Sequence, residues 1–318
     1  MKQLQNRIAE SGITLAVASV FAMGIWLLNG LIAKQLWPQL AFFVTSVYLF
    51  VELSNQNALL RVRSRMVSSI FILLSCTACF LFPYFDSGIV QLCFMSALLL
   101  LFQTYQDEQA MGRSFYAFLC IGLSSMVYVH TLWYVPVIWI LMAKQLQSLN
   151  WRTWLASFIG LLTPYWFSLL WFLVPRHFDD EWAMDLSPVG EHFSQLFDFN
   201  YEAPSFRLGH ILVIVFTVIL TTTGIIHFWR YSFEDKIRIR LLYGFFAVFA
   251  IFTLVFILVQ PQHFQVFMPL FFIGASPLIA HVLTLTSSRL SNILFFVAVA
   301  ILIAIAAYNL IVFNSYII

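Results

Sequence analysis

The stretch VPRHFDDEWAMD, residues 174–185, holds four of the fourteen acidic side chains of this 318-residue chain. A carboxylate can act as a general base, and imidazole with carboxylate can bind a divalent ion. We therefore expect Asp179 and Asp180 as candidate catalytic residues, with a divalent cation as a candidate cofactor. Arg176 and His177 are candidate substrate-binding residues beside them. The alternative is a solvated acidic loop that does no chemistry.

Other polar residues stand out because their surroundings are apolar. His130 lies between two short apolar segments in SSMVYVHTLWYVP, and a titratable group at a membrane edge is a functional candidate. In LVQPQHFQVFMP, residues 258–269, Gln262 and His263 occupy a tight corner where they could bind a sugar or a phosphate. Arg207 is a further cation for a phosphate group. The alternatives are an interfacial, hydrogen-bonded histidine and glutamines that satisfy backbone groups freed by prolines.

The composition indicates that the solvent of this chain is lipid. Its residues are 62% hydrophobic and only 9% charged, against about 25% charged in an average soluble domain. No basic patch interleaved with aromatic residues appears, so the sequence predicts no nucleic-acid partner. The C-x-x-C pair Cys76 and Cys79 lies within FILLSCTACFLF, without a histidine or acid nearby, and is typical of packing residues in a membrane helix.

Apolar runs of about 20 residues predict membrane-spanning helices, and shorter runs fit helices inside a bundle. We expect an all-α polytopic membrane protein of about eleven transmembrane helices in a single transmembrane domain, residues 1–318. The expected spans are 13–33, 37–53, 67–83, 88–104, 114–128, 132–147, 153–174, 209–231, 241–260, 264–285 and 291–313. The fifth and sixth are short, and the alternative is one long kinked segment.

Basic residues predict the orientation. With a cytoplasmic N-terminus, thirteen of the sixteen Lys and Arg residues face the cytoplasm, which is the usual bias. The expected location is the bacterial inner membrane, with the lipid bilayer as the first partner. The segment 175–208 becomes the only long outer loop, and SPVGEHFSQLFDFN within it predicts a short amphipathic helix that begins near Ser187 and Pro188.

Three apolar stretches carry a resemblance to a known class. Residues 98–142 and 263–283 are similar to the paired helices and the outward-starting helix of GT-C glycosyltransferases, which use polyprenyl-phosphate sugars. LNWRTWLASFIGLLTPYW, residues 149–166, resembles an uncharacterised family of bacterial polytopic membrane proteins. The resemblance implies a GT-C-like bundle that acts on a polyprenyl-linked or other lipid substrate.

One departure from the GT-C pattern bears on catalysis. Those enzymes carry their catalytic acid in a large first outer loop, whereas the first outer turn here, AKQLW at residues 33–37, has no acid. Asp179 or Asp180 would have to take that role, or another subunit would supply it. The expectation is thus a cell-envelope protein handling a lipid-linked glycan substrate at the outer leaflet. The alternatives are a non-catalytic membrane subunit bound to a membrane-protein partner, and a lipid flippase or transporter.

Overall fold

The computed structural model describes residues 4–62, 64–173, 187–198 and 206–315. Every regular element among these residues is a helix, which confirms the all-α membrane class. The chain forms two compact units, each described here by itself: unit 1 comprises Met1–Gln91 and Glu202–Ile318, and unit 2 comprises Leu92–Tyr201. The single-domain organisation stays a prediction.

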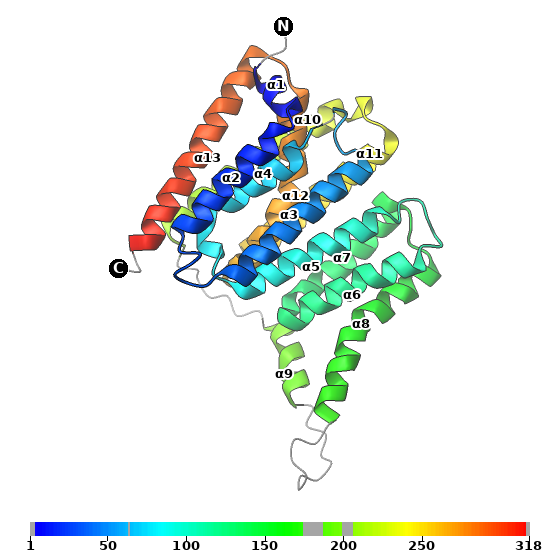
Figure 1. The fold of residues 1–318 in the computed structure, drawn as a ribbon. Coiled ribbons are helices and arrows are strands. Elements are labelled where there is room, and N and C mark those ends of the chain that lie inside the picture. The colour runs from blue at the N-terminus through cyan, green and yellow to red at the C-terminus, as the bar shows by residue number, and fades with distance from the viewer. Residues whose placement is uncertain (1–3, 63, 174–186, 199–205, 316–318) are drawn as a thin grey trace. The chain divides into compact units, whose positions relative to one another are not determined.

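Unit 1 holds the two ends of the chain (Figure 1). Its helices are α1 Leu4–Glu10, α2 Ile13–Leu28, α3 Trp37–Asn57, α4 Met66–Thr77, α10 Leu208–Tyr231, α11 Ile237–Val259, α12 Phe264–Leu285 and α13 Arg289–Ser315. Short 3-10 turns connect several of them: η1 Cys79–Leu81, η5 Ser232–Glu234 and η6 Pro261–His263. The chain bends by 84° between α1 and α2, so that α1 crosses the direction of the longer helix.

Unit 2 contains the middle of the chain, and α5, Phe85–Phe102, runs into it from unit 1. Its other elements are α6 Met111–Val127, η2 Val129–Trp133, α7 Tyr134–Leu141, η3 Met142–Leu146, α8 Trp151–Leu173, α9 Ser187–Ser194 and η4 Gln195–Phe197. The backbone turns extended at Tyr128, which ends α6 and separates the expected fifth and sixth spans. The predicted loop helix is present as α9 and begins at Ser187.

Each of the eleven apolar runs overlaps one of these helices. Among the described residues, five helices are long and apolar enough to cross a membrane: α5, α10, α11, α12 and α13. The number is six if α1 and α2 form one bent span. The membrane class is therefore supported, whereas the count of about eleven spans is not confirmed. Helices such as α4 and α6 are shorter than a full crossing.

Helix α12 is the core of unit 1. It is buried along most of its length and packs against α10, α11 and α4. Two prolines, Pro269 and Pro277, lie inside it. Neighbouring helices can satisfy the backbone carbonyls that such prolines free, which is why proline is tolerated inside a buried membrane helix.

The turns of unit 1 gather at two ends. At one end Asn29 Nδ2 donates to the Cys79 carbonyl oxygen (3.1 Å), and Gln265 Nε2 donates to the Tyr84 hydroxyl (2.9 Å). We call this the Asn29 end. Of these four residues, Tyr84 and Gln265 are expected on the outer side. The opposite end gathers the segments expected in the cytoplasm, and the candidate site lies there.

Candidate functional site

Four sequence-distant segments meet at the other end of unit 1, which we call the Arg61 end: residues 4–10, 52–65, 230–240 and 281–292. Gln5 Nε2 donates to the Leu283 carbonyl oxygen at 2.6 Å, which fixes α1 against the end of α12. Ser64 Oγ donates to the Ala9 carbonyl oxygen, which fixes the α3–α4 turn against α1. The end is therefore built by long-range polar contacts rather than by one loop.

A buried ionic network occupies this end. Arg61 Nε donates to Asp235 Oδ1 at 2.5 Å, and the other oxygen, Oδ2, lies 3.1 Å from His281 Nε2. The side chains of Asp235 and His281 are each only 1% exposed. His281 Nδ1 in turn lies 3.1 Å from His227 Nδ1. The result is a chain of four ionisable groups, Arg61–Asp235–His281–His227, which links the surface to the interior of unit 1.

The outer member of this network also reaches exposed groups. Arg61 Nη1 binds Glu234 Oε2 at 2.5 Å, and Nη2 donates to the Tyr231 carbonyl oxygen at 3.1 Å. The hydrogen bond to Asp235 raises the pKa of Arg61, with Glu234 adding to the effect. Arg61 is therefore a permanent cation that is held in place by two carboxylates and a backbone carbonyl.

The Arg61 end carries excess positive charge. Its described residues include eight basic and four acidic side chains, a formal net charge of 8 − 4 = +4 without histidine: Arg7, Arg61, Arg65, Arg230, Lys236, Arg238, Arg240 and Arg289 against Glu10, Glu52, Glu234 and Asp235. A cluster of this sign attracts anionic groups, most strongly at low ionic strength.

A polar pocket of about 740 Å³ opens at this end. Its lining comes from the end of α1 and the bend before α2, and from the last turn of α3 and the α3–α4 turn. It includes Arg61, Arg65, Glu10, Ser54 and Asn55. Arg65 can present its forked donors to an anion that enters the pocket. Arg61 adds positive charge, while its guanidinium already binds Asp235 and Glu234. The volume lies in the range of about 300–1,000 Å³ that small-molecule sites occupy.

An apolar groove of about 520 Å³ lies next to the polar pocket. Helices α2, α4 and α13 form most of it, and Figure 1 shows them adjacent in blue, cyan and red. The lining is almost wholly hydrocarbon, with Val17, Leu74 and Val299 as typical members. Ser11 lines both the groove and the polar pocket, so the two spaces meet at the bend between α1 and α2.

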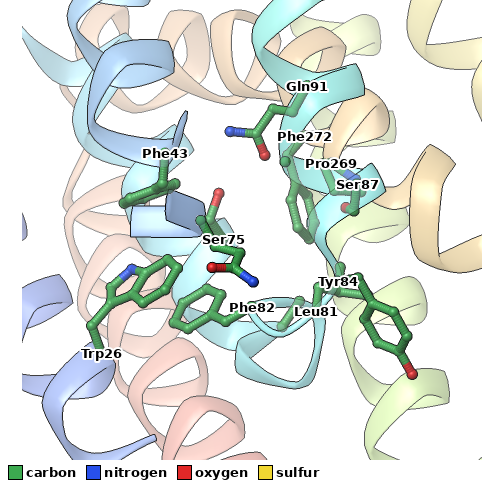
Figure 2. Close-up of a pocket in the computed structure, with 13 residues that line it drawn as sticks. Trp26, Phe43, Ser75, Leu81, Phe82, Tyr84, Ser87, Gln91, Pro269 and Phe272 are labelled. Carbon is green, nitrogen blue, oxygen red and sulfur yellow. The ribbon is translucent and has the colours of Figure 1, made fainter. Parts of the chain in front are cut away.

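A third, smaller pocket lies at the Asn29 end. Figure 2 shows Ser75 and Gln91 facing one another across it, with Trp26 and Phe82 along one side. The Trp26 and Phe82 rings stack with centroids 3.9 Å apart, and the cavity volume is only about 40 Å³. Such a volume holds a few water molecules at most, since one water needs about 10–15 Å³ by the same measure. This pocket is thus too small for a lipid-linked substrate.

The predicted catalytic pair cannot be placed. Asp179, Asp180, Arg176 and His177 lie outside the described residues. Within the described part of the chain, no group of three or more His, Cys, Asp or Glu residues could hold a metal ion. The divalent cation therefore stays a prediction attached to the 174–185 stretch.

The remaining predicted residues fall in different units. His130 lies in η2 of unit 2, whereas Gln262 and His263 lie in η6 of unit 1 and Arg207 is the exposed residue that precedes α10. Gln262 Nε2 is 3.4 Å from His263 Nε2, so these two neighbours contact one another. The role of these residues in substrate binding stays a prediction.

His130 is buried beneath the loop helix. His130 is only 6% exposed, and its neighbours in unit 2 include Gln195, Asp198 and His192. His192 Nε2 lies 3.0 Å from the Ser125 carbonyl oxygen, and the Tyr165 hydroxyl donates to Ser125 Oγ at 2.7 Å. α9 is thus fixed over the ends of α6 and α8, and His130 is part of that packing.

The environment of His130 predicts a pH effect on stability. Burial lowers its pKa more than the Gln195 backbone and the Asp198 carboxylate raise it. As the pH falls through about 6.5, His130 is protonated in the unfolded state but stays neutral in the native state. The native protein therefore loses stability below that pH. We expect the midpoint of thermal unfolding to drop less between about pH 7.5 and pH 5.5 in His130→Gln than in the unmodified protein. Equal drops would contradict this assignment.

The sequence analysis missed the network at the Arg61 end. The mixed-charge turn RYSFEDKIRIR, residues 230–240, is typical of the basic turns that anchor the cytoplasmic side of a membrane protein. A signal was present, because His227 and His281 are the only two histidines expected at the cytoplasmic side and each lies in the last turn or two of an apolar helix. What the residues did not reveal is that Asp235 and Arg61 join them.

No family model, curated protein or solved structure matches this chain. Its function must therefore be argued from the groove, the polar pocket and the ionic network.

Proposed function

We propose that this membrane protein binds a single anionic lipid at the Arg61 end of unit 1. The observation that carries the proposal is the junction at Ser11 of an apolar groove and a polar, arginine-lined pocket. A membrane lipid has the same two parts, a hydrocarbon tail and a charged headgroup. The tail would lie in the groove between α2, α4 and α13, and the headgroup would enter the pocket near Arg61 and Arg65.

The chemistry favours a phosphate headgroup. Arginine presents planar paired donors that match phosphate oxygens, and Arg65 is exposed at the pocket. Clusters of basic residues at the cytoplasmic side of membrane proteins commonly bind anionic lipid headgroups. Because basic residues favour the cytoplasm, the proposed site belongs to the inner leaflet.

A lipid-linked glycan is the narrower proposal within the same class. A polyprenyl phosphate also combines a hydrocarbon tail with a phosphate, so the same groove and pocket suit it. Transfer of a sugar at the outer leaflet would depend on Asp179 and Asp180, which lie outside the described residues. We keep that reaction, the GT-C-like bundle and the bacterial inner membrane as proposals separate from lipid binding.

Arg65→Gln tests the headgroup part of the site. We expect it to weaken binding of phosphatidylglycerol to the purified protein by about tenfold, because one charge-assisted hydrogen bond contributes about 1.5–3 kcal/mol. The measurement is a lipid titration followed by native mass spectrometry, repeated with polyprenyl phosphate to compare the two lipid classes. Arg240→Gln is the matched control, since Arg240 is an exposed arginine of the same end that does not line the pocket. If both variants weaken binding equally, only the general charge attracts lipid.

Val299→Trp tests the groove. Val299 lines it, whereas Val297, two residues earlier on α13, is 46% exposed and does not. We expect Val299→Trp to displace the bound tail and to lower the amount of co-purified anionic lipid several-fold, because the indole fills space that the tail occupies. Val297→Trp should leave the amount unchanged. Unchanged lipid in both variants would mean that the groove holds only ordinary bilayer lipid.

A further inference from the structure

The two histidines of the ionic network have no role in lipid binding as described so far. His227 lies near the end of α10 and His281 near the end of α12, and their Nδ1 atoms are 3.1 Å apart. Two adjacent Nδ1 atoms can form a hydrogen bond only if one carries a proton and the other does not. The positions of the protons in this pair therefore follow from the groups on either side.

Asp235 determines which histidine carries which proton. A carboxylate can only accept, so His281 Nε2, 3.1 Å from Asp235 Oδ2, is the donor of that contact. When His281 is neutral, its Nδ1 is then an acceptor and His227 Nδ1 must donate to it. His227 Nε2 is left as the proton-accepting atom at the end of the chain, on a side chain that is only partly buried.

We propose that His227, His281 and Asp235 form a proton-binding site that increases the affinity of the Arg61 pocket for an anionic lipid. An incoming proton bonds to His227 Nε2, and the proton on His227 Nδ1 moves to His281 Nδ1. Only N–H bonds change, one forming on each ring and one breaking on His227. The positive charge then resides on His281, beside the carboxylate of Asp235.

Asp235 and the Tyr243 ring favour the charge in that position, whereas burial and the Arg61 cation oppose it. The ionisable groups that face the pair are Arg61, Glu234 and Asp235, together with the two tyrosines Tyr231 and Tyr243. The Tyr243 ring lies 4.9 Å from the His281 ring, and aromatic faces attract cations. Asp235 is the nearest anion, at 3.1 Å from His281 Nε2, and it stabilises the imidazolium directly.

Asp235 couples the proton site to the lipid pocket, and this part rests on the proposed function. In the neutral state Asp235 has one cationic partner, Arg61. After protonation it is shared between two cations, so the charge of Arg61 is less fully compensated and attracts an anionic headgroup more strongly. By linkage, a bound headgroup must raise the proton affinity of the histidines by the same factor.

The proton site can be tested without any lipid. The full chain, reconstituted in phosphatidylcholine nanodiscs with 15N-labelled histidine, is titrated from about pH 4.5 to about pH 8.5, which brackets the usual histidine pKa. We expect the ring nitrogens of His227 and His281 to change together in one shared step, because the proton taken up on one ring ends on the other. In His227→Gln the His281 step should shift by at least about one pH unit. Separate, independent titrations, or no change over this range, would overturn the proton site.

The coupling needs a second measurement. Phosphatidylglycerol, whose phosphodiester keeps its charge throughout this range, should bind about fivefold or more tightly at about pH 5.5 than at about pH 7.5, at the lower end of typical coupling. The ratio of the affinities at the two pH values should fall to about one in His227→Gln and persist in His210→Gln. His210 is a histidine of unit 1 whose ring centroid lies 4.4 Å from that of Phe80. A pH-independent affinity with a normal histidine titration would overturn the coupling alone. Absence of phosphatidylglycerol binding at both pH values would overturn the proposed function, while the histidine titration would still decide the proton site.

Discussion

Asp235→Ala should lower the free energy of unfolding by about 3–5 kcal/mol, the typical cost of removing one partner from a buried ion pair. The variant would leave Arg61 without its buried carboxylate partner and His281 Nε2 without an acceptor. The side chains of Asp235 and His281 are each only 1% exposed. An isolated buried donor or charge keeps its desolvation cost but loses its compensation. Equilibrium unfolding in mixed micelles measures the loss.

Glu234→Ala is the matched control. Glu234 binds the same arginine at the same 2.5 Å, but its side chain is 47% exposed. Exposed ion pairs contribute about 0–1 kcal/mol, so we expect a small change at most. Similar losses in the two variants would contradict the view that burial of Asp235 makes this end of unit 1 stable. A large loss of stability in Asp235→Ala would make that variant unsuitable for testing the proton site, and His227→Gln serves that purpose instead.

Gly160→Leu should disrupt the packing of unit 2. Helices α6 and α8 form its most extensive helix pair, and a Cβ at Gly160 would lie 2.2 Å from the Phe115 carbonyl oxygen. On the facing helix, a Cβ at Gly122 would lie 2.6 Å from the Leu161 carbonyl oxygen. Both contacts are with backbone, so the helices themselves must separate. Small residues at such positions allow the close approach that stabilises membrane helix pairs.

We expect Gly160→Ala to cost about 1–3 kcal/mol, the usual range for overpacking, and Gly160→Leu to cost more or to prevent folding. Gly112→Ala is the control, because a Cβ at Gly112 meets nothing within 4 Å. Alanine there should be neutral or stabilising by up to about 1 kcal/mol through the lower entropy of the unfolded chain. Thermal unfolding in one detergent compares the three variants. If Gly160→Ala is as stable as Gly112→Ala, the close approach of α6 and α8 is wrong.

Both predictions rest on features that local sequence patterns do not contain. Along the chain, Asp235 is separated from Arg61 by 174 residues and from His281 by 46. The turn RYSFEDKIRIR looks like many cytoplasmic anchors, because charge bias reports the side of the membrane and not the neighbour of each charge. Only the packing of α10, α11 and α12 decides that one acid of this turn is buried and the other exposed.

The sequence by itself determined the membrane class and the region of most helices. Both follow from local properties: apolar runs set where helices lie, the 3-10 turn η2 falls at the break expected between two short spans, and Ser187 begins the loop helix. It also predicts which turns of unit 1 share a side of the membrane, because an uninterrupted helix must bring its two ends to opposite sides.

The tertiary structure decided everything that depends on how the helices are rotated about their own axes. Helix α12 is apolar and buried on nearly all sides, so its residues carry no periodic pattern that would show which face meets α10 or α4. The contact of His281 with His227, the junction of groove and pocket at Ser11, and the close approach at Gly160 each require two helix faces to be matched in space. Such matching arises from side-chain packing among distant segments. Local sequence patterns contain no information about which two helix faces pack together.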